Sequence, residues 1–248
     1  MKKNVNTFLS VIYWIFIVIT ALIFFPLYLI TYLLTFGFDE RRIIAHHFTR
    51  FWALFYLYIN PWIEFVIEGL EKIDKRKTYI VICNHQSMLD IFILYLLPLN
   101  FRWISKIEIF RIPIVGLVMK LNKYIPLERG NKESISKMYS CAEDSLRDGV
   151  SIIIFPEGTR SEDGKLKKFK EGAFHLSYKT GKNILLVIID KAYTILPKNS
   201  IFFEKRNNIK VRIIDEMPAI RDINNINNMI NIVEEIYKRE IEKMRKEE

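Results

Sequence analysis

The sequence predicts an α/β protein with a mainly parallel sheet flanked by helices, preceded by an N-terminal hydrophobic helical membrane anchor. Two observations predict this fold. Residues 8–38 contain no charged side chain, and that run exceeds the ~20 apolar residues that cross the hydrocarbon layer as a helix. From residue 78 onward, short apolar runs alternate with longer amphipathic stretches, as in a parallel sheet with connecting helices. We therefore expect a membrane-associated helical segment over residues 1–67 and one α/β domain over residues 68–248.

The apolar run is too long for a secretory signal and lacks a small-residue cleavage site, so it is expected to stay attached. Pro26 lies inside the run, where it removes a backbone hydrogen bond and bends or breaks a helix. Two architectures remain open: a single tilted spanning helix, or a bent hairpin that dips into one leaflet and returns.

Basic residues flank both ends of the apolar run, Lys2 and Lys3 before it and Arg41, Arg42 and Arg50 after it. The positive-inside tendency places such residues in the cytoplasm, which favours the hairpin. The sequence thus predicts a protein of the cell membrane whose α/β domain lies on the cytoplasmic side.

A second aromatic-rich stretch, residues 51–67, contains Asn60, Pro61 and Glu64, so it is a poor spanning segment and is expected at the interface. Amphipathic rings are typical of that level, although each could equally be an ordinary core aromatic. The rings in question are Trp14, Trp52, Tyr56, Tyr58 and Trp62.

In the α/β domain, four apolar runs are predicted as buried strands and two amphipathic stretches as helices, each helix followed by a glycine. The strands are residues 78–83, 151–155, 184–189 and 209–214, and the helices are residues 132–147 and 169–180. The charged tail, residues 224–248, is predicted as an amphipathic helix with a solvated face.

Cys83 and Cys141 are too few for a disulfide framework and indicate a reducing compartment. The formal net charge of +9 suits an anionic membrane surface or phosphate-bearing substrates as well as nucleic acid, and charge alone does not choose among them.

The passage at residues 83–90 follows the first predicted strand and opens a helical pattern. His85 and Asp90, five residues apart, would point about 140° apart on one regular helix. They can meet only if His85 lies on the turn before the helix, with Ser87 as the cap and Asp90 in the first turn. Asp90 would then orient the His85 ring as in a catalytic dyad, although such a pair can also be purely structural.

The passage at residues 155–161, Phe-Pro-Glu-Gly-Thr-Arg-Ser, follows another predicted strand. Pro156 ends the strand, Gly158 lets the backbone approach an anion, and Arg160 has the geometry to bind phosphate. The alternative is a polar turn in which Arg160 pairs with Glu157. Four lysines follow, which form either a solvated face or an attraction for phosphorylated ligands: Lys165, Lys167, Lys168 and Lys170.

Together these two passages resemble the glycerolipid acyltransferase family that includes the 1-acylglycerol-3-phosphate acyltransferases. Asn84, His85 and Asp90 match its Asn-His-x4-Asp motif, and residues 155–161 match its second motif throughout. Weaker motifs follow the same order: Lys106 with Pro113 and Gly116, then residues 125–129 and 169–174. The resemblance covers roughly residues 65–190.

The resemblance implies that residues 68–248 form a catalytic domain that transfers a fatty acyl group from acyl-CoA or acyl-ACP to the sn-2 hydroxyl of lysophosphatidate, giving phosphatidate in phospholipid synthesis. His85 would be the general base and Asp90 its partner. The thioester is a co-substrate, so no cofactor and no metal are expected. The expected partners are a phospholipid surface, lysophosphatidate and the acyl carrier, and not nucleic acid. The implied substrate-binding residues are Asn84, Lys106, Arg129, Glu157, Gly158, Thr159, Arg160 and Ser161.

The chain departs from the family after residues 184–189, where Asp190 and Lys191 replace a hydrophobic residue and proline thought to line the acyl pocket. This puts acyl selectivity and the acceptor in question. The alternatives are therefore an acyltransferase for another lysophospholipid or amino-lipid, or a non-catalytic membrane-tethered lipid binder. A lipid hydrolase is disfavoured, because Ser87 lacks the glycine-flanked elbow of such enzymes.

Overall fold

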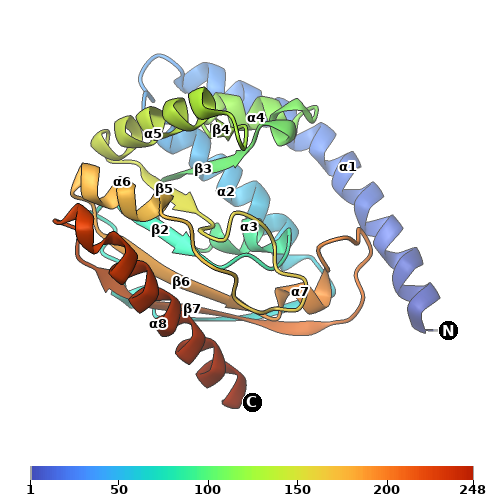
Figure 1. Cartoon of the computed structure of the whole chain (residues 1–248). Helices are drawn as coiled ribbons and strands as arrows, with labels where there is room; N and C mark the ends of the chain where they lie inside the picture. The colour runs from blue at the N-terminus through green and yellow to red at the C-terminus, as the bar shows by residue number, and fades with distance from the viewer. Residues whose placement is uncertain (1, 248) are drawn as a thin grey trace.

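The structure, a computed structural model, describes residues 2–247 and their side chains from residue 6 onward. Figure 1 shows a twisted central sheet with helices on both faces and a long N-terminal helix along one side. The helices are α1 Lys2–Thr35, α2 Ile43–Tyr58, α3 Leu89–Leu94, α4 Val115–Leu121, α5 Lys132–Arg147, α6 Gly172–Thr180, α7 Ala192–Ile195 and α8 Ile226–Lys246, with short 3-10 turns η1 Leu70–Lys72, η2 Ile107–Arg111 and η3 Ile223–Asn225.

The strands form one sheet in the order β1-β7-β6-β2-β5-β3-β4. They are β1 Ile63–Glu68, β2 Ile80–Cys83, β3 Phe101–Lys106, β4 Ile125–Leu127, β5 Ser151–Ile154, β6 Ile184–Asp190 and β7 Asn207–Met217. Every neighbouring pair is parallel except β6 with β7. The predicted mainly parallel sheet is confirmed, and the carboxyl ends of β2, β5, β3 and β4 therefore lie along one edge.

The start of the sheet lies earlier in the chain than the sequence predicted. β1 pairs with β7 from Ile63↔Asn207 to Glu68↔Arg212, so residues 63–67 belong to the α/β domain and not to the helical segment. The strand was missed because Glu64, Glu68 and Pro61 interrupt its apolar pattern. A strand at the edge of a sheet, half buried in an alternating pattern, does not need a continuous apolar run.

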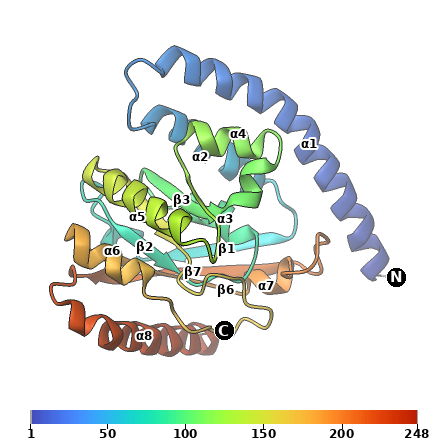
Figure 2. The ribbon, with the colours of Figure 1, turned by 45° about the horizontal axis from the view of Figure 1, so that its top comes forward.

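The N-terminal segment is a helical hairpin, but Pro26 is not its turn. Helix α1 continues through Pro26 as one curved helix, and the chain reverses only between Thr35 and Ile43 before α2 packs beside it (Figure 2). The helix is therefore not broken at Pro26, and its curvature is consistent with the bend that was the other predicted effect of this proline. The side chains of Lys2 and Lys3 are not among those that the structure describes, so their part in the predicted orientation stays a prediction.

Aromatic side chains hold the hairpin together. Phe24 of α1 contacts the rings of Phe51, Trp52 and Phe55 of α2. Trp52, Tyr56 and Trp62 are buried, whereas Tyr58 is exposed. Three of the five rings assigned to a lipid interface thus pack inside the protein.

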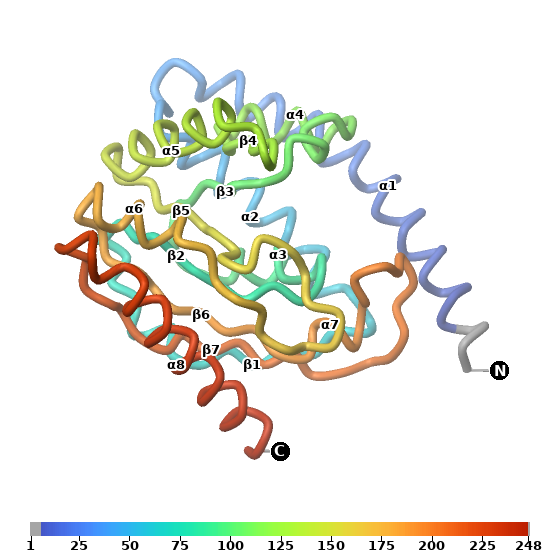
Figure 3. The backbone as a smooth tube through the Cα atoms, in the orientation of Figure 1, coloured from blue at the N-terminus to red at the C-terminus, as the bar shows by residue number. Residues whose placement is uncertain are grey.

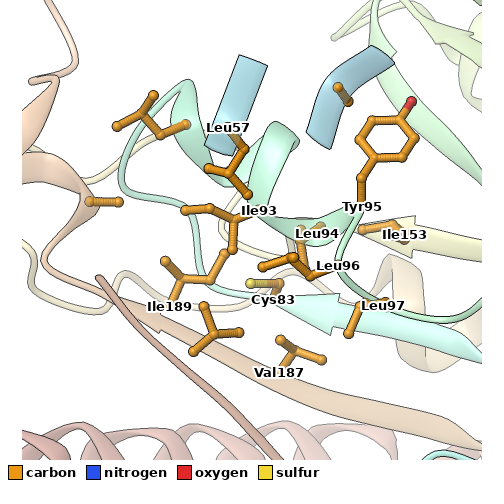
Figure 4. Close-up of a cluster of buried hydrophobic side chains, with 14 of the residues drawn as sticks. Leu57, Cys83, Ile93, Leu94, Tyr95, Leu96, Leu97, Ile153, Val187 and Ile189 are labelled. Carbon is orange, nitrogen blue, oxygen red and sulfur yellow. The ribbon is translucent and has the colours of Figure 1, made fainter. Parts of the chain in front are cut away.

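One face of the sheet packs against α2 and α3. Figure 4 shows the centre of this core, where Leu57 of α2 and Ile93 of α3 meet Cys83, Val187 and Ile189 of the strands. All of these side chains are buried. This core fixes α3 directly after β2, which is the position that the site requires.

The other face is covered by α5, α6 and α8. The tail helix α8 is not only a solvated surface, because it buries Ile230, Val233 and Tyr237 against the sheet. The Tyr237 hydroxyl donates to the Ile82 carbonyl at 2.8 Å. The sequence concealed this role because α8 carries many charges, which lie on its outer side.

Candidate active site

The two sequence passages meet at the carboxyl edge of the sheet. Residues 84–88, here the catalytic turn, follow β2, and residues 155–171, here the β5–α6 loop, follow the neighbouring strand β5. Figure 3 shows the β5–α6 loop as a long excursion near α3 and α7. Ligand sites of parallel sheets occur at this edge.

His85 and Asp90 form the predicted pair. His85 lies on the turn before α3, Asp90 lies in the first turn of α3, and the His85 Nδ1 is 2.8 Å from the Asp90 Oδ2. The same oxygen accepts hydrogen bonds from the backbone amides of Gln86 at 2.6 Å and Ser87 at 2.8 Å. Asp90 is fully buried, so these three donors, rather than water, stabilise its Oδ2. The other oxygen, Oδ1, has no hydrogen-bond partner among the described atoms.

The hydrogen bond to Asp90 determines which nitrogen of His85 can act as a base. A carboxylate accepts, so Nδ1 donates, and the lone pair of neutral imidazole is then on Nε2. Within the described residues Nε2 has no hydrogen-bond partner, and the His85 side chain retains 16% of its exposure. The ring stacks on Phe155, with centroids 3.8 Å apart, so its orientation is fixed from both sides.

Side chains of the catalytic turn bind the end of β6 and the end of α7. The side chain of Asn84 donates from Nδ2 to the Ile189 carbonyl at 2.8 Å, and its Oδ1 accepts from the Ile189 backbone amide at 2.9 Å. The Ser87 hydroxyl donates to the Leu196 carbonyl at 2.7 Å. Asn84 is buried, so the structure gives it a role in holding the turn, and its predicted substrate contact stays a prediction.

The expected cap at Ser87 is displaced by one residue. Met88 occupies the N-cap position of α3 and makes no side-chain cap bond. The Ser87 hydroxyl instead accepts from the Leu89 amide at 3.3 Å. The Asp90 carboxylate binds the amides of Gln86 and Ser87, which precede the helix, so it holds the turn and does not cap α3.

Glu157 connects the β5–α6 loop to the catalytic turn. Its Oε1 accepts from the His85 amide at 2.7 Å, and its Oε2 accepts from the Lys167 amide at 2.9 Å. Burial raises the pKa of Glu157 to about 7. Both oxygens are used within the protein, so Glu157 shapes the loop, and its predicted substrate contact stays a prediction.

Of the remaining loop residues, some hold the loop in place and others have accessible side chains. Gly158 has a positive φ of 69°, and an added Cβ would lie 3.0 Å from the Lys170 Nζ. Ser161 is buried, and its amide donates to the His85 carbonyl at 2.7 Å. Thr159 and Arg160 are half-buried, which leaves their side chains accessible from the loop surface.

Arg160 does not form the ion pair with Glu157 that would make the loop a simple polar turn. Its carbonyl accepts from the Lys167 Nζ at 2.9 Å, but no ion pair involves its guanidinium among the side chains described. An uncompensated arginine on a loop at this edge is suited to a phosphate or carboxylate ligand.

Lys106 and Arg129 lie on the same edge as the dyad. Lys106 ends β3 and Arg129 comes two residues after β4, and both are exposed. From the usual spacing of neighbouring strands, β3 lies roughly 10 Å from β2 and β4 lies roughly 14 Å from it. Neither side chain has an ion-pair partner in the part of the chain that the structure describes. They add positive charge at the rim of the site.

Two nucleophile candidates are buried. The Cys83 thiol donates to the Asn84 carbonyl at 3.2 Å, and burial raises its pKa well above the ordinary value. Ser87 is fully buried and its hydroxyl is bound to Leu196. Neither is placed to attack a substrate carbonyl, so the arrangement favours direct proton abstraction by His85. Among the described residues, no three His, Cys, Asp or Glu side chains are grouped to hold a metal.

Asp190, the departure from the family pattern, is buried and does not line an open acyl pocket. Its carboxylate binds both Nε and Nη2 of Arg245, at 2.9 Å and 2.8 Å. Sequence reasoning missed Arg245, although one signal pointed to it. A carboxylate at the end of a fully buried strand requires a cationic partner somewhere in the chain.

The chain is similar to known proteins over much of its length. A family model described as Acyltransferase matches residues 64–197. The chain is 38% identical over 176 residues to the chloroplastic 1-acyl-sn-glycerol-3-phosphate acyltransferase LPAT1 of Arabidopsis thaliana, a match that covers 70% of this chain and 49% of that protein. A 1-acyl-sn-glycerol-3-phosphate acyltransferase of Borreliella burgdorferi is 32% identical over 148 residues, 58% of this chain and 59% of that protein. The chain thus spans about half the length of the plant relatives it matches.

Among solved structures, the crystal structure of the 1-acyl-sn-glycerophosphate (LPA) acyltransferase PlsC from Thermotoga maritima superposes with a TM-score of 0.77 at 26% sequence identity. The match covers 98% of both chains. The similarity therefore includes the N-terminal hairpin as well as the sheet and its flanking helices.

Proposed function

Because the chain belongs to the Acyltransferase family, we propose that it transfers a fatty acyl group from an acyl thioester to the sn-2 hydroxyl of lysophosphatidate, giving phosphatidate. The observation that carries this proposal is the His85–Asp90 pair on the same sheet edge as the unpaired Arg160. The names of the relatives support lysophosphatidate as the acceptor. The donor in the proposal is acyl-CoA or acyl-ACP.

In this reaction, Nε2 of His85 removes the proton from the acceptor hydroxyl as its oxygen attacks the thioester carbonyl. Asp90 stabilises the imidazolium that forms, through the 2.8 Å contact at Nδ1. The new ester bond forms as the carbon–sulfur bond breaks, and the thiolate leaves with an ordinary pKa near ~8.5. His85 then returns its proton to the sulfur, so no acyl-enzyme and no resident cofactor are needed.

The acceptor phosphate is proposed to bind at the β5–α6 loop. Arg160 supplies a guanidinium free of ion pairs, and the exposed residues Lys106 and Arg129 add positive charge at the rim. Gly158 and Thr159, which precede Arg160 in the same loop, are proposed to contribute backbone and hydroxyl contacts to the phosphate. Glu157 and Ser161 contribute by holding this loop to His85 through backbone contacts.

We propose that the hairpin attaches the enzyme to the cell membrane, with the catalytic domain on the cytoplasmic side. Residues 6–35 of α1 are long and apolar enough to cross a bilayer, and only 11% of their most apolar window is buried against the protein. Further exposed apolar residues occur on the η2–α4 segment, namely Ile109, Ile112, Val115 and Leu117. Attachment there spares the acceptor lipid a costly extraction from the bilayer.

The test is an assay of the purified protein in detergent or vesicles with lysophosphatidate and long-chain acyl-CoA or acyl-ACP, following phosphatidate and free thiol together. We expect the wild type to form both in equal amounts, also with a chelator present. His85→Ala should abolish both, and Cys83→Ala, a substitution of the buried neighbour, should retain them.

Three results would contradict the proposal. Thiol release without phosphatidate would indicate a hydrolase. Acylation of another lysophospholipid or an amino-lipid in preference to lysophosphatidate would keep the acyltransferase chemistry and change the acceptor. A folded protein that binds anionic vesicles but turns over no donor with any lysolipid would be a membrane-tethered lipid binder. A role in nucleic-acid binding is not part of the proposal.

A further inference from the structure

The C-terminal helix reaches the active site through one ion pair, in which the carboxylate of Asp190 is buried and the side chain of Arg245 is 39% exposed. Asp190, the last residue of β6, is 1% exposed. Both of its oxygens bind the guanidinium of Arg245, which lies in the last turn of α8. This bidentate geometry is the strongest arrangement open to a carboxylate and an arginine. It joins the end of β6 to the end of α8, although the two residues are 55 positions apart in the chain.

On one side, the ion pair contacts the catalytic turn. The Asp190 Oδ1 accepts from the Gln86 side-chain amide at 3.3 Å. The Gln86 Oε1 is buried and has no partner among the described atoms, so Asp190 is the group that orients this side chain. The backbone amide of the same residue donates to the Asp90 Oδ2 at 2.6 Å. The chain of contacts thus runs from Arg245 through Asp190 and Gln86 to the partner of His85.

On the other side, Arg245 contacts the β5–α6 loop. Its Nη2 donates to the Gly164 carbonyl at 3.1 Å. Gly164 packs against Tyr193 so closely that a Cβ there would lie 2.3 Å from the ring. Three residues earlier, the Ser161 amide donates to the His85 carbonyl at 2.7 Å. The guanidinium therefore adds a second link between the catalytic turn, which it reaches through Asp190, and the loop that carries Arg160, beside the direct contacts of Glu157 and Ser161 with the His85 backbone.

We propose that Arg245, acting through Asp190, is a positioning residue for the acyl transfer. It fixes the relation between the base His85 and the phosphate-binding Arg160, so that the hydroxyl of a bound acceptor lies within reach of Nε2. The inference rests on the proposed function, because it assigns Arg245 a part in that reaction. Asp190 and Lys191 stand where the resemblance implies a hydrophobic residue and a proline.

From the position of the pair, we expect its loss to lower turnover more than substrate binding. Arg245 and Asp190 lie behind the catalytic turn and touch neither the dyad nor Arg160 directly. Removing their restraint leaves the charges that bind substrate in place but lets the turn and the loop move against each other. Misplacement of reacting groups by about 1 Å can cost on the order of 100-fold in rate.

The experiment compares kcat and KM of the full-length wild type with those of Arg245→Lys, Asp190→Asn and the double variant Asp190→Asn/Arg245→Gln. Arg245→Lys keeps the positive charge beside Asp190, but one ammonium cannot hold both carboxylate oxygens and the Gly164 carbonyl in a fork. The double variant removes both charges, so it leaves no isolated buried ion. Lys238→Gln is the matched control, because Lys238 lies on the same helix and, among the described side chains, its one ion pair is with the exposed Glu235.

We expect Arg245→Lys and the double variant to lower kcat about tenfold or more, with KM for both substrates changed less than about threefold. Lys238→Gln should match the wild type. Asp190→Asn should lower kcat by about as much as the double variant, because the two residues act as one unit. A folded Arg245→Lys and a folded double variant that both keep the wild-type kcat would overturn the inference.

A second readout does not depend on activity. Hydrogen–deuterium exchange should increase in peptides that cover residues 84–90 and 155–171 in Arg245→Lys and the double variant, and not in Lys238→Gln. Unchanged exchange in both segments would also overturn the inference. If the wild type itself makes no phosphatidate, the proposed function fails, whereas increased exchange would still show that Arg245 restrains the two segments.

Discussion

At the scale of single residues, the Asp90 Oδ2 organises the reacting group. This oxygen accepts from the His85 ring and from two consecutive backbone amides, all within 2.8 Å. The ring hydrogen bond selects the tautomer, and the two amide bonds fix the carboxylate against rotation. A single buried carboxylate therefore couples the conformation of the turn to the tautomer of His85 that the proposed reaction requires.

Asp90→Asn tests this coupling. The amide oxygen can still accept from the backbone, but the neutral side chain no longer stabilises the imidazolium or enforces the tautomer. We expect kcat for phosphatidate formation to fall roughly 10²- to 10⁴-fold with a preserved fold. Asp144→Asn, at an exposed position of α5, is the control and should retain full activity. Comparable rates for the two variants would remove Asp90 from the mechanism.

Glu157 predicts a pH dependence of stability. Its pKa is raised by burial from 4.5 to about 7. Between these two pH values the folded protein keeps a proton on Glu157 that the unfolded chain has released. The stability contributed by this proton is fully present below pH ~4.5 and is lost as the pH rises through about 7.

The measurement is the free energy of unfolding in denaturant for the wild type and Glu157→Gln at several pH values. Relative to the variant, which has no carboxyl to titrate at residue 157, the wild type should lose on the order of 1 kcal/mol per pH unit across that window. A difference that stays constant with pH, or that grows as the pH rises, would show that the carboxylate is ionised in the fold throughout.

At the scale of elements, the α1–α2 hairpin and the η2–α4 segment present apolar side chains outward. Val118 of α4 packs in the same cluster as Tyr28 of α1 and Trp52 of α2, so these elements form one continuous body. The exposed Ile112 and Val115 lie on the same segment as this contact. A water-facing surface of this kind would be unfavourable, because it leaves large apolar areas unburied.

Acidic substitutions on the exposed face of α1 test its contact with lipid. Val18 and Leu22 are both about 60% exposed, at 61% and 62%, and one turn apart. We expect Val18→Asp/Leu22→Asp to shift the protein away from phospholipid vesicles in flotation, because each charge costs ~2.5–3.5 kcal/mol at the bilayer centre.

The control for this flotation experiment is Ser136→Asp/Ser140→Asp, which adds the same charges at exposed positions of α5 with the same spacing. This variant should float with the vesicles as the wild type does. If the α1 variant floats equally well, another surface must carry the membrane contact.

At the scale of the whole molecule, the two layers of helices are joined through the sheet at the active-site strands. Tyr237 of α8 reaches between β2 and β6, donating to the Ile82 carbonyl and accepting from the Val187 amide at 3.2 Å. Cys83 and Val187 on the opposite face belong to the core below α3. The tail helix thus supports the strands from which the catalytic turn departs.

Tyr237→Phe should therefore destabilise the fold although it removes a single oxygen atom. The Val187 amide is left buried without its hydroxyl partner, which costs about 1–3 kcal/mol. The melting temperature should fall measurably, whereas Tyr58→Phe, at a ring that is 66% exposed, should leave it unchanged. Equal melting temperatures for both variants would mean that the Tyr237 hydroxyl contributes nothing to the fold.

The sequence by itself determined the elements whose signal is local. Continuous apolar runs predicted β2, β5, β6 and β7, and the predicted helix at residues 132–147 coincides with α5. A run without charges predicted α1. The dyad was also predictable, because a turn between His85 and Asp90 is the one local geometry in which these side chains meet. The edge strand β1 and the short strands β3 and β4 were not found, since their apolar patterns are brief or alternating.

Only the tertiary structure decided the roles that depend on partners distant in the chain. It showed that Glu157 binds the backbone of His85 instead of Arg160, that Asn84 binds Ile189, and that Asp190 binds Arg245. It also showed that the charged tail covers the sheet. The physical reason is that a local pattern specifies backbone conformation and burial, whereas a polar side chain's partner depends on which segments the fold brings within about 3 Å.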